Sequence, residues 1–193
     1  MTLGIRDQKR ANFRRDACTY SKHFRLAALY GTDTHTQNVS PIEEATLREL
    51  SPPSFASGEG GLHSTAHDYL GAARMLLGRG RCEGVRVLSH RAVALMTTNQ
   101  LPLEERKSSR WAGRGFGLGV EIVEDLAQQN AYSDLGEYAS VGSYGWPGAL
   151  GTYWLVDPKE DMIQIFMIQQ RPTDRSLSIA KVFHRLAYHA IDD

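Results

Sequence analysis

The sequence of residues 140–157 is SVGSYGWPGALGTYWLVD, and it is followed by the apolar run DMIQIFMIQQ at residues 161–170. Tyr153 to Val156 in the first stretch are aromatic, aliphatic or β-branched, and such residues favour strands. The Asp-Pro-Lys-Glu break at residues 157–160 is typical of a turn. We therefore predict that the two runs form an antiparallel hairpin.

The first strand of this predicted hairpin contains a proline among glycines. Pro147 has no N–H to donate to a neighbouring strand, so we expect one edge of the strand to face something other than a strand at that point. Gly145, Gly148 and Gly151 remove side chains from the same segment, which allows a ligand to approach the backbone closely. A bulged edge strand without any chemistry is the alternative.

Residues 144–149, YGWPGA, resemble the active-site strand of the serine hydrolases related to class C β-lactamases and penicillin-binding proteins. The resemblance is to their esterase branch, in which Trp-Gly-Gly replaces the Lys-Thr-Gly triplet. It extends over nearly the whole chain, but over only about the C-terminal half of the family's catalytic domain. The other matching segments follow the family's order and include residues 3–7, 25–31, 60–62, 64–66, 68–69, 75–77, 87–89, 95–96, 115–119, 151–153 and 156–158.

The remaining elements predict an α+β fold. Ser64 or Thr65 caps a helix, Ser89 begins a second one, and apolar residues recur at helical spacing over residues 179–191. Residues 116–124 alternate as a strand does, and residues 103–114 are expected to be a solvated connection. We predict a single domain over residues 1–193, in which helices pack on an antiparallel sheet of about three strands. The resemblance implies that this is a partial β-lactamase/transpeptidase-like fold.

Composition excludes some classes of partner. The 193 residues include 22 basic and 22 acidic side chains, so we expect no binding to nucleic acid or to an anionic membrane. No apolar run reaches the length of a transmembrane helix. Cys18 and Cys82 are expected to be free thiols, and a cytoplasmic location is the default expectation because the chain contains no signal segment. The basic N-terminal residues are not taken as a transit peptide, because residues 3–7 already resemble the family.

The resemblance implies acyl transfer, in which a serine attacks a carbonyl and a lysine three residues later and a tyrosine move the proton. Only Ser178 and Lys181 have this spacing in the chain. They lie downstream of Trp146, whereas the family's nucleophile lies upstream of the matching strand. Tyr20-Ser21-Lys22 is also in the wrong order relative to residues 3–7. No nucleophile or base is therefore assigned.

The resemblance does assign residues on the wall of the active site that faces the nucleophile and the base. Trp146, Pro147 and Gly148 occupy the positions of Lys, Thr and Gly, and Ala149 provides a backbone N–H as one of two oxyanion-hole donors. Pro147 departs from the family's usual glycine, which removes a donor and stiffens the strand. Tyr144 shares a strand face with Trp146 and Gly148, so it either lines the cleft or is a packed core tyrosine. We therefore predict a catalytic role for the Ala149 backbone and substrate binding by Tyr144, Trp146 and Gly148.

No metal ion or other cofactor is expected. His63 and His67 are four residues apart, as zinc ligands on a helix can be, but Ser64 stands where such motifs have glutamate. No third ligand occurs at a recognisable spacing, so we predict a solvated helix start instead.

Two hypotheses for function follow. In the first, the chain is the C-terminal portion of a serine hydrolase that cleaves small esters or β-lactam-like amides when the N-terminal half complements it. In the second, it is a non-catalytic remnant that binds a small carbonyl ligand or a partner chain.

Residues 162–170 are apolar on both strand faces and contain no proline or lysine, so we expect their outer edge to be occupied. The candidates are an N-terminal-half partner, a second copy in a homo-oligomer, or residues 3–21 folding back.

Overall fold

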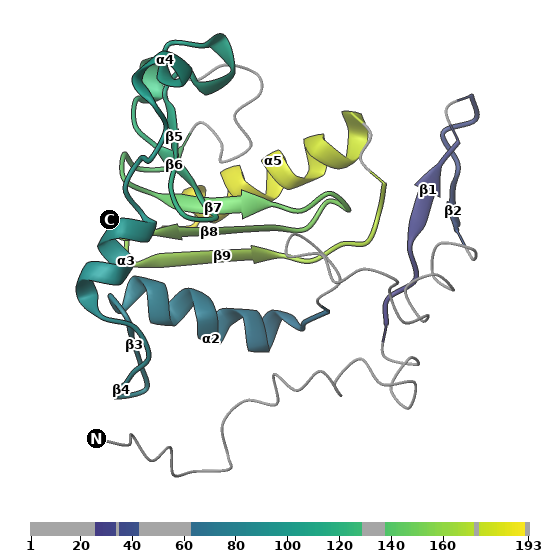
Figure 1. The fold of residues 1–193 in the computed structure, drawn as a ribbon. Coiled ribbons are helices and arrows are strands. Elements are labelled where there is room, and N and C mark those ends of the chain that lie inside the picture. Colours follow the sequence, from purple (N-terminus) through teal and green to yellow (C-terminus); the bar gives the residue numbers. More distant parts are fainter. Residues whose placement is uncertain (1–25, 34, 43–62, 129–137, 172–173, 192–193) are drawn as a thin grey trace, which may run out of the picture.

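The fold is built around a five-stranded antiparallel sheet in the order β5-β6-β7-β8-β9, so that consecutive strands are neighbours (Figure 1). The computed structural model describes residues 26–33, 35–42, 63–128, 138–171 and 174–191, without the side chains of 174–178. The strands of the sheet are β5 (Arg114–Phe116), β6 (Glu121–Val123), β7 (Tyr144–Pro147), β8 (Tyr153–Asp157) and β9 (Met162–Phe166).

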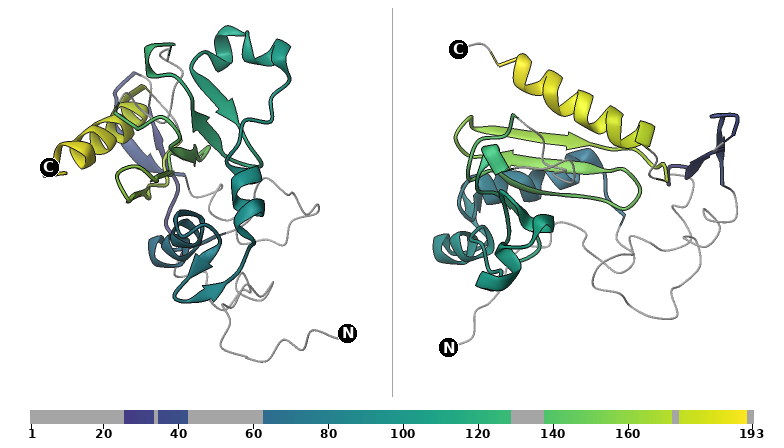
Figure 2. Two further views of the ribbon diagram at one scale, coloured as in Figure 1. Left: turned by 90° about the vertical axis from the view of Figure 1, so that its left-hand side faces the viewer. Right: turned by 90° about the horizontal axis from the view of Figure 1, so that it is seen from above.

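Helices cover both faces of this sheet. Helix α2 (Ala66–Leu77) lies on one face and α5 (Asp174–His189) on the other, as the view from above in Figure 2 shows. The smaller elements are β1 (Tyr30–Thr32), β2 (Val39–Pro41), β3 (Arg81–Cys82), β4 (Val85–Arg86), α3 (His90–Met96), α4 (Leu103–Arg106) and the 3-10 turns η3 (Ser109–Trp111) and η4 (Leu126–Gln128). The predicted α+β class is confirmed.

The two predicted helix starts are confirmed. Thr65 caps α2, because its hydroxyl accepts a hydrogen bond from the Asp68 N–H at 3.2 Å. Ser89 caps α3 in the same way, with a 3.0 Å bond from the Ala92 N–H. Gly78 follows the last turn of α2 and its N–H bonds back to the Arg74 carbonyl.

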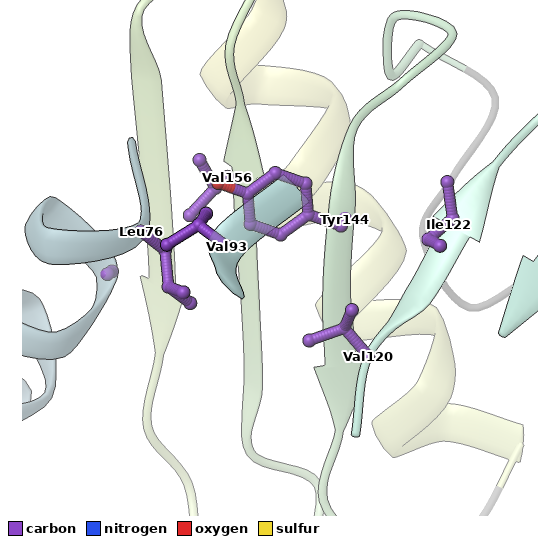
Figure 3. Packing of buried hydrophobic residues seen from close by; sticks show 7 residues of the cluster. Leu76, Val93, Val120, Ile122, Tyr144 and Val156 are labelled. Atoms are coloured by element: carbon purple, nitrogen blue, oxygen red, sulfur yellow. The ribbon is translucent and has the colours of Figure 1, made fainter. Parts of the chain in front are cut away.

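Alternation along β8 divides the core into two clusters. Trp154 and Val156 belong to the cluster under α2, whereas Tyr153 and Leu155 belong to the cluster under α5. Figure 3 shows the first cluster, which brings together residues from helices and strands that are far apart in sequence: Leu76, Val93, Val120, Ile122, Tyr144 and Val156. Because Leu155 is completely buried, truncating it to alanine is expected to cost roughly 2–5 kcal/mol.

The predicted hairpin of β8 and β9 is confirmed. The stretch that was expected to supply its first strand, residues 140–157, forms two strands and not one. Residues 140–157 contain both β7 and β8, which pair with each other from Tyr144 with Val156 to Pro147 with Tyr153. The turn between them depends on Gly151, which has a φ of +83°. A side chain at Gly148 would bring its Cβ to 2.0 Å from the Thr152 hydroxyl. Gly148 and Gly151, which sequence analysis attributed to ligand access, therefore also form a turn, whereas Gly145 lies within β7.

Residues 116–124 likewise form parts of a hairpin and not one strand. β5 and β6 pair antiparallel, and Gly119 lies in the turn between them with a φ of +87°. The sheet therefore has five strands, where about three were predicted. Short strands separated by glycine-containing turns alternate in the same way as one longer strand, which explains the error.

The prediction that residues 103–114 form a solvated connection is also wrong in part. This segment contains α4 and η3, and its last residue, Arg114, is buried in β5. The Arg114 guanidinium forms a buried ion pair with both carboxylate oxygens of Glu121, each at 3.1 Å. A charged residue is buried here because its partner from β6 is buried with it, and composition alone does not reveal such a pairing.

Candidate active site

The edge of β7 becomes free where the sequence predicted it. β6 pairs with β7 through Tyr144 and Gly145, and this ladder ends before Trp146. On its other side β7 continues to pair with β8 through Trp146 and Pro147. Within the described part of the chain, no strand faces the outer edge of these two residues, and Pro147 leaves no N–H unsatisfied there.

Trp146 is the exposed aromatic residue at this free edge, with 40% of its surface accessible. Its ring meets Phe116 edge to face at a centroid distance of 5.2 Å, and Phe116 contacts Trp111 at 5.7 Å. The guanidinium groups of Arg110 and Arg114 lie 5.5 and 5.4 Å from the Trp111 ring. Trp146, Phe116 and Trp111 form an aromatic row beside the free edge.

Ala149, which was predicted to be an oxyanion donor, lies in the turn after β7. The Gly148 N–H bonds to the Thr152 carbonyl at 2.7 Å, and the Gly151 N–H bonds to the Gly148 carbonyl at 3.0 Å, so the turn is fixed by its own backbone. Ala149 lies between these bonds and is exposed. Among the described residues no acceptor bonds to its N–H, which leaves that group available to a ligand oxygen.

Of the two alternatives for Tyr144, a cleft-lining residue or a packed core tyrosine, the structure shows the second. Tyr144 is only 4% exposed and packs in the cluster under α2, with Val93 and Val156. Burial raises the pKa of its hydroxyl to about 12, so the group is neutral over the whole physiological range. In this structure Tyr144 is a packed core residue, while Trp146 is exposed near the end of the same strand and Gly148 lies in the turn that follows it.

The model of the beta-lactamase family matches residues 17–189 of the chain. The chain belongs to the beta-lactamase family. Protein Rv1367c of Mycobacterium tuberculosis is 45% identical over 128 residues, which are 64% of this chain and 31% of that protein. The chain thus spans less than a third of the length of this relative.

Solved structures show the same beta-lactamase-like fold. Simvastatin synthase, LovD, from Aspergillus terreus matches with a TM-score of 0.68 at 20% identity, over 88% of this chain and 44% of that chain. EstCE1, a hydrolase with promiscuous acyltransferase activity, matches with a TM-score of 0.64 at 20% identity, over 84% and 44% of the two chains. In both cases this chain corresponds to less than half of the matched protein.

The one Ser-x-x-Lys spacing in the sequence of this beta-lactamase family chain lies on the sheet face opposite to that of Trp146. Ser178 and Lys181 are in α5, which covers one sheet face. Trp146 pairs with Trp154, and Trp154 contacts Tyr69 of α2 on the opposite face, with ring centroids 5.5 Å apart. The fold therefore does not bring this serine and lysine to the free edge of β7.

A buried polar layer under α5 was not predicted. Nδ1 of His184 lies 2.9 Å from Oε1 of Gln164 and 3.1 Å from the Tyr153 hydroxyl. Burial lowers the pKa of His184 to about 4, and the nearby charge of Asp157 offsets this only partly. Because neutral His184 is fixed between a helix and the sheet and is 2% exposed, we assign it to the core and not to catalysis.

Sequence analysis missed Phe116, Trp111 and the polar layer. Phe116 contacts Trp146, and Trp111 contacts Phe116, through the packing of side chains that are far apart in sequence, and no local motif indicates these contacts. His63 and His67 are both exposed. Across the described ranges, no three His, Cys, Asp or Glu side chains are close enough to hold a metal ion. None of the helices in those ranges is long and apolar enough to span a bilayer.

Proposed function

We propose that this chain provides one wall of an acyl-transfer site that hydrolyses small esters or β-lactam-like amides. The observation that supports it is the free end of β7, where the exposed Ala149 N–H lies beside Trp146 in a member of the beta-lactamase family. The site is complete only when another segment contributes the family's serine, lysine and tyrosine.

In the proposed mechanism the substrate carbonyl oxygen accepts a hydrogen bond from the Ala149 N–H. The serine oxygen of the complementing segment forms a bond to the carbonyl carbon, its proton passes to the base, and the oxyanion is stabilised by Ala149 and by the N–H of the serine itself. Collapse of this intermediate breaks the bond to the alcohol or amine, which leaves with the proton. Water then releases the acyl group. The aromatic row contacts the apolar part of the substrate.

Complementation tests this proposal. The chain is co-expressed with a segment of a beta-lactamase family member that contains Ser-x-x-Lys, and hydrolysis of a short-chain nitrophenyl ester is measured. Ala149→Pro removes the N–H and is expected to lower kcat by about 10²–10³, the usual effect of one oxyanion donor. Ala149→Gly retains the N–H and is the matched control. Equal turnover in these two variants, with unchanged unfolding temperatures, contradicts the assignment of Ala149.

The second candidate function is binding without catalysis. It is favoured by the exposed ring of Trp146 and by its contact with Phe116, which together offer an apolar surface to a ligand. It predicts that the chain alone binds a non-hydrolysable amide, such as an acyl anilide, at the aromatic row. Isothermal titration should then show binding that Trp146→Ala weakens and that Val87→Ala, at an exposed position outside the sheet, does not. Undetectable binding by the wild-type chain rules out this candidate for that ligand class.

A further inference from the structure

We infer that the β3–β4 hairpin and the start of α3 form a docking surface for an acidic polypeptide segment of a partner protein. The guanidinium groups of Arg81 and Arg86 bind its carboxylates, and Arg91 extends the surface onto α3. In Figure 1 the hairpin projects from the end of α2, away from the sheet. The docking surface is therefore separate from the free end of β7, and its occupation does not depend on the proposed function.

Positive charge is concentrated at this docking surface. Residues 79–91 contain four arginines, at positions 79, 81, 86 and 91, and one acidic residue, Glu83, whereas the whole chain has a formal net charge of zero. All four arginines are exposed, and none of them forms an ion pair with another residue of the described ranges. A local excess of one sign in a neutral chain attracts partners of the opposite charge.

Two features of the docking surface are unfavourable without an anionic partner. Arg81 and Arg86 lie directly opposite each other in the β3–β4 ladder, and like charges in that position destabilise a hairpin. The first turn of α3 contains His90 and Arg91 but no acidic residue, so Arg91 lies at the positive end of the helix dipole. Sequences break such local rules chiefly at functional sites. A carboxylate bound beside these cations relieves both conflicts.

The backbone holds the Arg86 guanidinium in position. Its Nη1 donates to the Leu88 carbonyl at 3.0 Å and to the Arg79 carbonyl at 3.4 Å. The Gly80 carbonyl accepts the N–H groups of Val87 and Leu88, at 2.8 and 3.2 Å, and so closes the base of the hairpin. Within the described ranges, the Nε and Nη2 donors of Arg86 have no acceptor. That side of a guanidinium matches the two oxygens of a carboxylate.

The chemistry of the surface favours a polypeptide over other anions. An exposed ion pair contributes little, so a single small anion is held weakly, whereas a segment with several carboxylates engages all three arginines together. Residues 79–91 contain no Phe, Tyr or Trp to stack on nucleic-acid bases. Glu83 lies in the turn at the hairpin tip, which opposes approach to an anionic membrane. Exposed Val85 and Val87 add an apolar contact, as protein interfaces have.

Binding of a labelled hexaglutamate peptide to the chain tests the docking surface, with fluorescence anisotropy as the measurement. We expect the wild-type chain to bind this peptide at low salt, and about 0.5 M NaCl to weaken the binding at least tenfold. Arg81→Gln and Arg91→Gln should each lower the affinity about fivefold, whereas Arg81→Lys should retain part of it. Arg185→Gln is the matched control, because it removes one exposed arginine from α5 on the other sheet face, and it should not change the affinity.

The unfolding temperature provides a second measurement. Because Arg81→Gln removes a like-charge pair, the unfolding temperature of this variant without peptide should rise by about 1–3 °C. A lower unfolding temperature contradicts the conflict assigned to Arg81 and Arg86. No binding by the wild-type chain, or an equal loss of affinity in Arg185→Gln, overturns the docking surface. Tighter binding of inorganic phosphate, of vesicles with anionic lipids or of single-stranded DNA than of the peptide overturns the assignment of a polypeptide partner.

Discussion

The Tyr188 hydroxyl donates a 2.6 Å hydrogen bond to Oδ2 of Asp157 and so joins α5 to the end of β8. Asp157 is completely buried, and its Oδ2 also accepts the Ser140 N–H at 3.0 Å. Its Oδ1 accepts the N–H groups of Lys159 and Glu160 in the turn before β9. One carboxylate therefore fixes the final helix, the β8–β9 turn and the approach to β7.

Removal of the Tyr188 hydroxyl should destabilise the fold. Tyr188→Phe leaves a buried carboxylate without one donor, and the expected loss in the free energy of unfolding is about 1–3 kcal/mol. Urea denaturation measures it. Tyr138→Phe is the control, since Tyr138 is exposed and contacts His189 only through its ring. A loss below that of Tyr138→Phe contradicts the role assigned to the hydroxyl.

Acid should weaken the contact between α5 and the sheet before it protonates most carboxylates. The folded pKa of His184 is about 4, below its ordinary value of 6.5, so the unfolded chain binds a proton in this window that the folded chain does not. The free energy of unfolding therefore falls as the pH is lowered from about 6.5 to 4, by at most about 3 kcal/mol.

The pKa of Asp157 is also lowered. Burial opposes ionisation, but the hydrogen bonds from Tyr188 and from the Ser140 backbone exceed that effect. The stability that ionised Asp157 contributes is present above its ordinary pKa of 3.8 and is lost as the pH falls through the folded value.

His184→Gln tests which group titrates in each range. The free energy of unfolding of this variant should vary less with pH between pH 6.5 and 4, and only there. An unchanged slope in that variant shows that His184 is not the titrating group.

Sequence patterns predicted the parts of this fold that local chemistry determines. Thr65 and Ser89 cap helices through hydrogen bonds to residues three positions away. Two apolar runs rich in strand-forming residues and separated by a short turn predicted the β8–β9 hairpin. The Arg114–Glu121 pair depends on the register of the β5–β6 hairpin, and the contact of Phe116 with Trp146 depends on how side chains of β5 and β7 pack. Such contacts have no local pattern, so the aromatic row could not be predicted.

Trp146 should be the tryptophan most accessible to a small quencher. It is 40% exposed, whereas Trp111 and Trp154 are half-buried. Acrylamide quenching of the wild-type chain should therefore be stronger than that of Trp146→Phe. Trp154→Phe removes a more shielded tryptophan, so the remaining fluorescence should be quenched more strongly than in the wild type. Identical quenching of Trp146→Phe and wild type counts against an exposed Trp146.

The chain without a complementing segment should show no acyl-enzyme chemistry. Stabilisation of an oxyanion by Ala149 cannot replace a missing nucleophile, and Ser178 lies in a helix on the other sheet face. Incubation with a short-chain nitrophenyl ester or a chromogenic β-lactam should give neither a burst nor turnover above buffer. A burst that Ser178→Ala abolishes makes Ser178 the nucleophile and overturns the assignment.

Two glycine substitutions should have opposite effects. A Cβ at Gly117 would lie 2.0 Å from the Met96 carbonyl oxygen, which accepts the Leu118 N–H at 2.9 Å and holds the β5–β6 hairpin against α3. Gly117→Ala must displace the hairpin, at a cost of roughly 1–3 kcal/mol. Gly71 lies inside α2 with open space at its Cβ, so Gly71→Ala should stabilise by about 0.5–1 kcal/mol through helix propensity. Because Phe116 precedes Gly117, only Gly117→Ala should also alter the near-ultraviolet circular dichroism of the aromatic row. If both variants unfold at the wild-type temperature, the packing of the hairpin on α3 is looser than the structure shows.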